Sequence, residues 1–200
     1  MRNRGDVTKK RLLDAALLLF TQKPYEKVTL REIEGITNLS RGALMHHASN
    51  KETLFKQAVD MFVFGNNTLT SLPESERGSL EQTIHNFMKL LAREQEHWRE
   101  VGIRNINYAL FNVQSSYYST IPGSLKIAKE WYENECRIWR EVIEKAIETG
   151  EIRHVDADLF AHIFEDCYLG DAYAAITGET GYSLPKLEEQ LMAIYELLKK

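Results

Sequence analysis

The chain has 200 residues, of which 44% are hydrophobic and 27% are charged, and its formal net charge is −4. This composition is typical of a globular protein with one or two domains and a substantial core. The apolar runs are short and the N-terminus MRNRGDVTKKR is charged, so we expect neither a membrane span nor a signal peptide. The two cysteines, Cys136 and Cys167, lie far apart and are expected to be free thiols in a reducing cytoplasm.

The charge is divided unequally along the chain. Residues 1–56 contain 11 Lys and Arg residues and 6 Asp and Glu residues, a net charge of +5, whereas the remainder carries −9. A basic end joined to an acidic body suggests that only the first part meets a polyanion. Charge segregation also occurs on ordinary solvated faces, so it assigns no function by itself.

Apolar residues recur at three- and four-residue spacing and no segment alternates as a strand does, so we predict an all-α fold of about nine helices. The expected helices span residues 7–22, 29–36, 40–48, 50–70, 79–100, 103–115, 124–149, 156–177 and 184–199. The apolar face of the first helix consists of Leu12, Leu13, Ala16, Leu17 and Phe20.

Local signals mark the starts of the short N-terminal helices. Thr29 and Glu32 form the pattern of a capping box, and Ser40 and Asn50 are good N-caps. About three residues, TNL, connect the second and third helices, and Asn38 in this turn tolerates a left-handed backbone. Two short helices joined by a short turn are the pattern of a helix-turn-helix.

The segment SLPESERGS at 71–79 is rich in Pro, Gly and Ser and lies at the end of a long helix. We expect a helix-turn-helix DNA-binding domain at 1–55 and a ligand-binding and dimerisation domain at 56–200. Residues 50–70 are expected to form one helix that connects the two domains.

The adjacent histidines His46 and His47 raise the question of a metal or catalytic site. Neighbouring residues on a helix point about 100° apart, so the two side chains are unsuited to chelating one ion. No Cys, Ser or carboxylate lies at a helical spacing that would activate a nucleophile there. We therefore predict neither a metal site nor a catalytic site.

A surface that lies against DNA explains more of the stretch NLSRGALMHH. Gly42 inside a helix costs about 1 kcal/mol relative to Ala, and close approach to a phosphate or a base edge would offset this cost. Ser40 and Arg41 beside it supply a hydroxyl and a charged donor. The alternative is that Gly42 packs tightly on the second helix and the histidines are simply exposed.

Residues 8–55 closely resemble the DNA-binding domain of TetR-type, or tetracycline-repressor-like, transcriptional regulators. The shared features are Ala15–Ala16 before Phe20, the start TLREI of the second helix, SRGAL with the following HH, and NKETLF. The resemblance implies phosphate contacts from Thr29 and Lys51 and groove contacts from Ser40, Arg41 and Gly42. It also implies that Met45 and His46 reach the DNA backbone and bases, with His47 close by.

The sequence departs from the family pattern at four positions. Met45 and Ala48 replace aromatic residues, Asn38 replaces the turn glycine, and Pro24 replaces the common glycine before a tyrosine. Met45 lacks a hydroxyl that would bond phosphate, and Ala48 trims a core contact. We expect these changes to alter the DNA affinity and the operator preference rather than the fold.

Members of this family form dimers through their last two long helices. The resemblance therefore implies an interface on apolar seams that recur at three- and four-residue steps. The expected interface residues are Phe160, Phe164, Tyr168, Leu187, Leu191 and Ile194. The alternative is that both seams are buried within one chain.

Aromatic residues are abundant in the middle helices, where the resemblance implies a ligand-binding region. Such walls suit flat or apolar small molecules, with polar groups such as Asn107 fixing their orientation. We expect ligand contacts from Trp98, Asn105, Tyr108, Phe111, Trp131, Trp139 and His162. An ordinary aromatic core is the alternative.

One enzymatic hypothesis is a di-iron helical bundle, which uses Glu-x-x-His pairs. Glu94–His97 lies in the polar run AREQEHWRE, and Glu151–His154 follows a helix stop, so neither pair is expected to bind metal. We predict a protein that is not an enzyme and that has no cofactor.

The sequence therefore predicts a bacterial transcriptional regulator that acts as a repressor. By the resemblance, a homodimer binds a palindromic operator in double-stranded DNA and an unidentified small molecule releases it, with no membrane involved. The competing hypothesis is a helical ligand-binding protein that has lost DNA binding, which the residues Met45 and Ala48 keep open.

Overall fold

The computed structural model describes residues 4–64 and 68–200. Within these residues the fold is all-α, as predicted, and an isolated bridge between Ile152 and Lys199 is the one element of β type. The helices are α1 (Arg4–Gln22), α2 (Leu30–Thr37), α3 (Arg41–His47), α4 (Lys51–Val63), α5 (Leu80–Glu100), α6 (Ile106–Thr120), α7 (Ser124–Glu148), α8 (Ala157–Ala174) and α9 (Leu184–Leu198).

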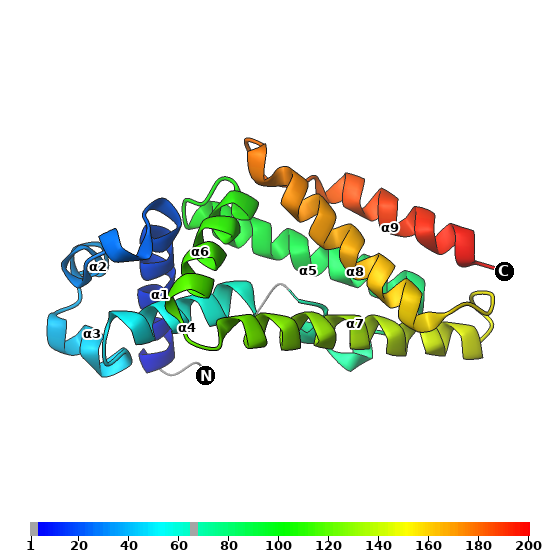
Figure 1. Ribbon diagram of the computed structural model, residues 1–200, viewed down its shortest axis with the longest axis horizontal. Helices are drawn as coiled ribbons and strands as arrows, with labels where there is room; N and C mark the ends of the chain where they lie inside the picture. Colours follow the sequence, from blue (N-terminus) through cyan, green and yellow to red (C-terminus); the bar gives the residue numbers. More distant parts are fainter. Residues whose placement is uncertain (1–3, 65–67) are drawn as a thin grey trace.

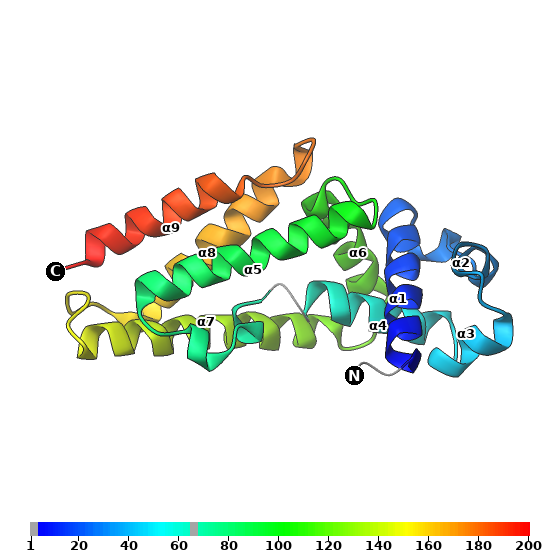
Figure 2. The ribbon, with the colours of Figure 1, turned by 180° about the vertical axis from the view of Figure 1, so that it is seen from behind.

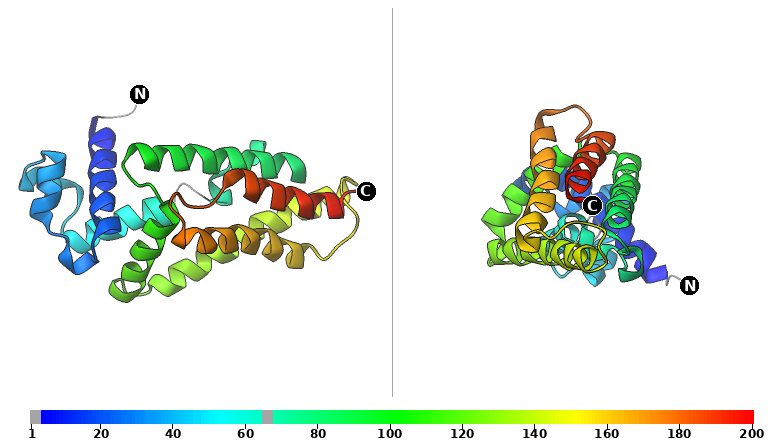
Figure 3. Two further views of the ribbon diagram at one scale, coloured as in Figure 1. Left: turned by 90° about the horizontal axis from the view of Figure 1, so that it is seen from above. Right: turned by 90° about the vertical axis from the view of Figure 1, so that its right-hand side faces the viewer.

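The molecule is elongated, with α1, α2 and α3 at one end (Figure 1). Helix α4 leads from this end into a body in which α5, α7, α8 and α9 run lengthwise and α6 crosses them (Figures 1 and 2). Helix α7 packs most extensively against α8, and α5 packs against α9. The C-terminus lies at the far end of the body from α2 and α3 (Figure 3).

The first helix folds as its apolar spacing predicts. Its five predicted core side chains are buried, namely Leu12, Leu13, Ala16, Leu17 and Phe20. They pack in one continuous core with α4, whose Leu54, Phe55, Ala58 and Val59 are also buried. Because α1 and α4 share this core, the N-terminal end of the molecule is a packed unit rather than a loose arm.

The predicted connecting helix at 50–70 is too long. Helix α4 ends at Val63, residues 65–67 lie outside the described residues, and the chain resumes in a 3-10 helix at Leu69–Ser71. Gly65, Asn66 and Asn67 all have low helix propensity, which gives a physical reason for the earlier end.

A buried carboxylate holds the segment that follows α4. Glu135 on α7 is 1% exposed and accepts hydrogen bonds from the backbone N–H groups of Leu69 and Thr70 and from the Thr70 hydroxyl. Three donors to one carboxylate are a strong anchor in a buried setting. No pattern in the sequence indicates this contact, since Glu135 lies on a helix that otherwise looks amphipathic.

The apolar seams of α8 and α9 are largely buried within this chain. Phe164 and Leu187 are 0% exposed, Leu191 is equally buried, and Tyr168 is 8% exposed. These four predicted interface residues therefore pack inside the chain's own core, because α8 and α9 bury one face against α5 and α7. Phe160 and Ile194 are half-buried.

None of the helices in the described residues is both long enough and apolar enough to cross a membrane.

Candidate nucleic-acid interface and ligand cavity

Helices α2 and α3 are joined by a sharp turn whose geometry follows from its residues. Asn38 caps α2 with a left-handed backbone, φ 54° and ψ 27°, as predicted. The buried side chains of Ile33 on α2 and Leu44 on α3 then fix the two helices against the core. This arrangement is a helix-turn-helix, with α3 as its second helix (Figure 1).

The start of α3 presents its polar side chains to solvent. Ser40 is the N-cap, as predicted, and its hydroxyl accepts a hydrogen bond from the N–H of Ala43 at 3.2 Å. The Arg41 side chain is 61% exposed and donates to Glu34 on α2 at 3.2 Å. An exposed ion pair of this kind contributes little to stability, so the Arg41 guanidinium is available to another partner.

Gly42 lies in open space. A Cβ atom added to it would meet no atom within 4 Å, and the residue is exposed. The alternative of tight packing on α2 is therefore wrong. No contact within the described residues accounts for a glycine at this position.

The three remaining predicted residues of α3 differ in exposure. His46 is exposed, His47 is half-buried, and their rings lie 5.4 Å apart between centroids at 68° to one another. Met45 is half-buried and packs against the core. His46 is thus the histidine that faces solvent most fully.

Thr29 and Lys51 already have partners within the chain. Thr29 and Glu32 form the predicted capping box, with N–H contacts of 2.9 and 3.3 Å. A hydrogen bond from Lys23, together with those from Thr29, lowers the pKa of Glu32 to about 2. Lys51 Nζ donates to the carbonyl oxygens of Tyr25 and Val28 at 2.9 and 3.2 Å.

Lys51 also lies over the ring of Tyr25, at 4.1 Å from its centroid. An ammonium group has three N–H donors, so these two carbonyls leave one for a phosphate. Sequence reasoning missed this structural role, because the carbonyls are contributed by backbone 23 and 26 residues earlier in the chain.

The seven predicted ligand contacts do not come together. Phe111 and Trp131 line one cavity. Trp98 and Trp139 are core residues, 1% and 0% exposed, and Tyr108 is 52% exposed. Asn105 caps α6 and donates to the carbonyl of Ala175, and His162 lines a separate outer groove.

The cavity lined by Phe111 and Trp131 lies between the end of α4 and helices α6, α7 and α8, and we call it the α4–α8 cavity. Its volume is about 180 Å³. Its further lining includes Phe62, Gln114, Tyr168 and Ala172, none of which sequence reasoning had selected as a ligand contact. Phe62 and Ala172 are apolar residues like many others in the sequence, so only their position in the fold identifies them as cavity lining.

Comparison with known proteins decides the family. Residues 12–58 match the family model described as bacterial regulatory proteins, tetR family. Residues 12–58 therefore belong to the tetR family of bacterial regulatory proteins. It is 26% identical to the uncharacterized HTH-type transcriptional regulator YvkB of Bacillus subtilis (strain 168), over 86% of this chain and 89% of YvkB.

Two further similarities concern one part of the chain and its whole fold. It is 33% identical over 52 residues to the biofilm operon icaADBC HTH-type negative transcriptional regulator IcaR of Staphylococcus epidermidis (strain ATCC 35984 / DSM 28319 / BCRC 17069 / CCUG 31568 / BM 3577 / RP62A), covering 26% of this chain and 28% of IcaR. The solved SmeT–triclosan complex has the same fold, with a TM-score of 0.65 and 15% identity over 97% of this chain and 92% of that one.

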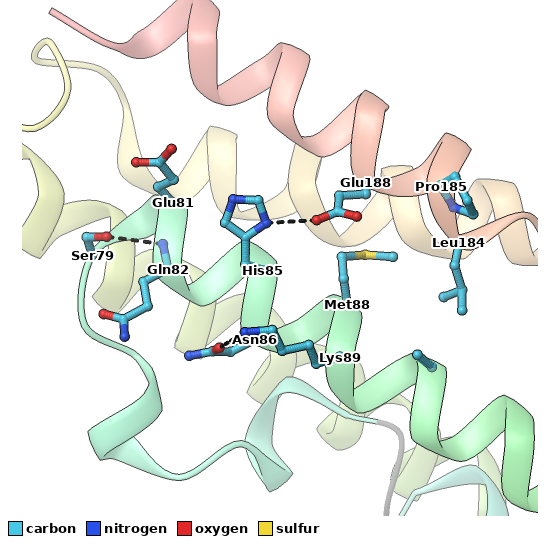
Figure 4. Close-up of a pocket in the computed structure, with 11 residues that line it drawn as sticks. Ser79, Glu81, Gln82, His85, Asn86, Met88, Lys89, Leu184, Pro185 and Glu188 are labelled. Atoms are coloured by element: carbon cyan, nitrogen blue, oxygen red, sulfur yellow. Dashed lines mark hydrogen bonds and ion pairs between the residues drawn. The ribbon is translucent and has the colours of Figure 1, made fainter.

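A second hollow of the molecule is an outer groove between α5 and α9 (Figure 4). His85 on α5 and Glu188 on α9 bridge it, with His85 Nδ1 at 2.7 Å from Glu188 Oε1. Met88 and Leu184 provide apolar walls beside this pair. Charged side chains line this groove, which distinguishes it from the α4–α8 cavity.

The two Glu-x-x-His pairs of the chain have other contacts. His97 on α5 lies 3.9 Å from Asp14 on α1, and burial raises the pKa of Glu94. Glu151 accepts hydrogen bonds from the first two N–H groups of α5 at 3.0 and 3.1 Å, and so caps that helix. No group of three or more His, Cys, Asp or Glu side chains in the described residues is arranged to hold a metal ion.

Proposed function

We propose that this TetR-family regulator is a repressor that binds a palindromic operator as a homodimer and is released by a small molecule. It would act in the cytoplasm, where bacterial DNA lies. Its DNA-binding domain would comprise residues 1–55, and residues 56–200 would bind the ligand and form the dimer. The similarity to IcaR, whose name describes a negative regulator, supports repression as the output.

The observation that carries the proposal is the start of α3. Ser40, Arg41 and Gly42 are all exposed there, and an added Cβ at Gly42 would meet no atom within 4 Å. His46, near the end of the same helix, is also exposed. A helix start with free polar groups and no Cβ allows the backbone to approach DNA closely. Met45, His47, Thr29 and Lys51 complete the proposed contact set.

Dimerisation would use the outer face of α8 and α9. Phe160 and Ile194 are half-buried, whereas Leu159 is 55% exposed, Ile163 is 37% exposed and Leu197 is 72% exposed. Exposed aliphatic side chains at three- and four-residue spacing are typical of a face that another helix covers. A two-fold dimer would hold two copies of α3 about 34 Å, or a multiple of that, apart.

Release would act through α4. One end of α4 carries Lys51, which bonds the segment before α2, and the other end, Phe62 and Val63, lines the α4–α8 cavity. A ligand that favours one position of α4 would change the separation of the two α3 helices. Such couplings typically amount to about 1–3 kcal/mol. The solved triclosan complex of SmeT supports a small organic effector.

Selection of bound sequences from a random duplex pool tests the proposal. We expect enrichment of a palindrome, and affinity for it that falls steeply with salt because phosphate contacts release counterions. No enriched sequence, with protein that remains folded, would instead favour the hypothesis of a ligand-binding protein that has lost DNA binding.

A further inference from the structure

The α4–α8 cavity is lined by neutral side chains. Among the described residues that form it there is no carboxylate, amine, guanidinium or imidazole group. The groove between α5 and α9, by contrast, contains Glu81, His85, Lys89 and Glu188. Transferring a charged molecule from water into a site without a counter-charge is very costly. The lining therefore selects against ions of either sign.

The size and walls of the cavity limit the shape of its occupant. An apolar cavity of about 150 Å³ is large enough to hold benzene, and this one measures about 180 Å³. Phe62, Phe111, Trp131 and Tyr168 provide aromatic surfaces. A molecule built on a single substituted ring fits this space, whereas a long chain or a large ring system does not.

One hydrogen-bond donor of the cavity lining has no partner in the part of the chain that the structure describes. The Nε1–H of Trp131 is buried and reaches no acceptor among the described residues. The side-chain oxygen of Asn107 already accepts a hydrogen bond from the N–H of Tyr182 at 3.0 Å. A buried donor without a partner costs free energy, and a ligand that supplies an acceptor recovers it. The occupant is thus expected to offer an oxygen that accepts hydrogen bonds.

We propose that the α4–α8 cavity binds an uncharged single-ring aromatic molecule that carries a hydrogen-bond acceptor. This inference rests on the proposed function, since it names the class of effector that the regulator would sense. The ring lies against Phe62 at the end of α4, and Trp131 on α7 donates to the acceptor oxygen. The bound ring therefore contacts α4, the helix that leads to the DNA-binding end of the molecule.

Four probes of nearly equal size test the proposal by isothermal titration calorimetry. Acetophenone is neutral with a carbonyl acceptor, ethylbenzene has the same shape without the acceptor, and benzoate and benzylammonium carry opposite charges. We expect ethylbenzene to bind about three- to ten-fold more weakly than acetophenone. Benzoate and benzylammonium should bind at least about 100-fold more weakly. Equal binding of a charged probe, or equal binding of ethylbenzene and acetophenone, overturns the proposal.

Two substitutions locate the binding. Trp131→Phe keeps an aromatic wall and removes the donor, so acetophenone should lose its advantage over ethylbenzene. Tyr132→Phe, which removes a hydroxyl donor of α7 outside the cavity lining, should preserve that advantage. Ala172→Leu fills the cavity and should abolish binding of both neutral probes. Thermal unfolding confirms that each variant is folded. Unchanged binding in folded Trp131→Phe and Ala172→Leu contradicts the assignment.

The same protein is tested for operator binding, which separates this inference from the proposed function. An enriched palindrome together with no binding of any neutral probe overturns the ligand class alone. Binding of acetophenone without binding of any DNA supports the cavity and refutes the repressor.

Discussion

A single glycine separates stability from DNA recognition in this protein. Gly42 is exposed in α3 and a Cβ there would meet nothing within the chain. Alanine is favoured over glycine in helices by up to about 1 kcal/mol, so Gly42→Ala should raise the free energy of unfolding slightly. If Gly42 meets DNA, the same change should weaken operator binding, which fluorescence anisotropy measures.

Gly35 provides the matched control for this prediction. It lies in α2, is exposed, and also has nothing within 4 Å of an added Cβ. Gly35→Ala should give the same gain in stability with no loss of DNA affinity. Equal DNA affinity for Gly42→Ala and the wild type would mean that Gly42 does not approach the duplex.

Arg41 is predicted to contribute to sequence discrimination. Arg41→Ala should weaken operator binding by about 1–3 kcal/mol if the guanidinium bonds a guanine edge. Its partner supplies the control: Glu34→Gln breaks the 3.2 Å ion pair and leaves Arg41 in place, so operator affinity should be retained. Gel-shift titration of both variants checks this, and unchanged binding in Arg41→Ala removes it from the contact set.

Among individual residues, the sequence predicted local roles better than distant ones. The caps at Thr29, Ser40 and Asn50 and the left-handed Asn38 are confirmed, because each depends on residues within three positions. The bonds from Lys51 to Tyr25 and Val28 were not predictable, because they require α1 and α4 to be packed first.

At the scale of the helix pair α7 and α8, a buried acid predicts a pH dependence of stability. Glu165 on α8 is 0% exposed and accepts a hydrogen bond from Trp139 at 3.2 Å, while its other oxygen has no partner in the described residues. Burial, with repulsion from Glu135 and Asp166, raises the pKa of Glu165 to about 8. The unfolded chain ionises the same group near its ordinary value of 4.5.

The direction of the change in stability with pH follows from the number of protons that each state binds. Between about pH 4.5 and 8 the folded state holds a proton on Glu165 that the unfolded state releases, so stability is lost as the pH rises, by about 1.4 kcal/mol per pH unit. Glu165→Gln should remove this loss and leave a variant more stable than the wild type at pH 8. Glu144→Gln, an exposed change on α7, should leave the slope unaltered. Urea unfolding from pH 5 to 9 measures the pH dependence of the free energy of unfolding for the three proteins.

Helix boundaries were predictable where a proline or a glycine interrupts the helical pattern. Pro24, Gly123 and Gly150 lie at or near the ends of elements that the sequence located within a few residues. The end of α4 at Val63 was missed, because the apolar run continues to Phe64 and hides the stop. The inward face of α8 and α9 was predicted to form the dimer interface but packs in the chain's own core. An apolar stripe does not reveal whether the surface that covers it comes from the same chain or from another.

For the whole molecule, the dimer is the prediction with the largest effect. Ile163→Glu places a charge on the exposed apolar face of α8 and should shift the protein towards monomer in analytical ultracentrifugation. Operator binding should weaken with it, because one α3 helix reads only half of a palindrome. Leu125→Glu, at a site 68% exposed on α7, is the matched control and should remain dimeric. A fully dimeric Ile163→Glu protein would exclude this face.

The all-α architecture was predictable as a whole, because helical periodicity recurs throughout the chain and the family motifs fall in the first quarter. The residues that line the ligand cavity were not predictable. Phe111 and Trp131 were selected for being aromatic, and so were Trp98 and Trp139, which lie in the core. Composition cannot separate an aromatic wall from an aromatic core, since only packing leaves one of them beside empty space.

The hydrogen bond donors that surround Glu135 bear on how chimaeric regulators are built from this chain. Leu69 and Thr70 follow α4 by only a few residues, yet their N–H groups donate hydrogen bonds to a carboxylate 66 and 65 positions further on, respectively. A graft that exchanges the operator-binding end is therefore best spliced before residue 69. A splice beyond it replaces the segment whose backbone N–H groups and Thr70 hydroxyl bond the buried Glu135 side chain.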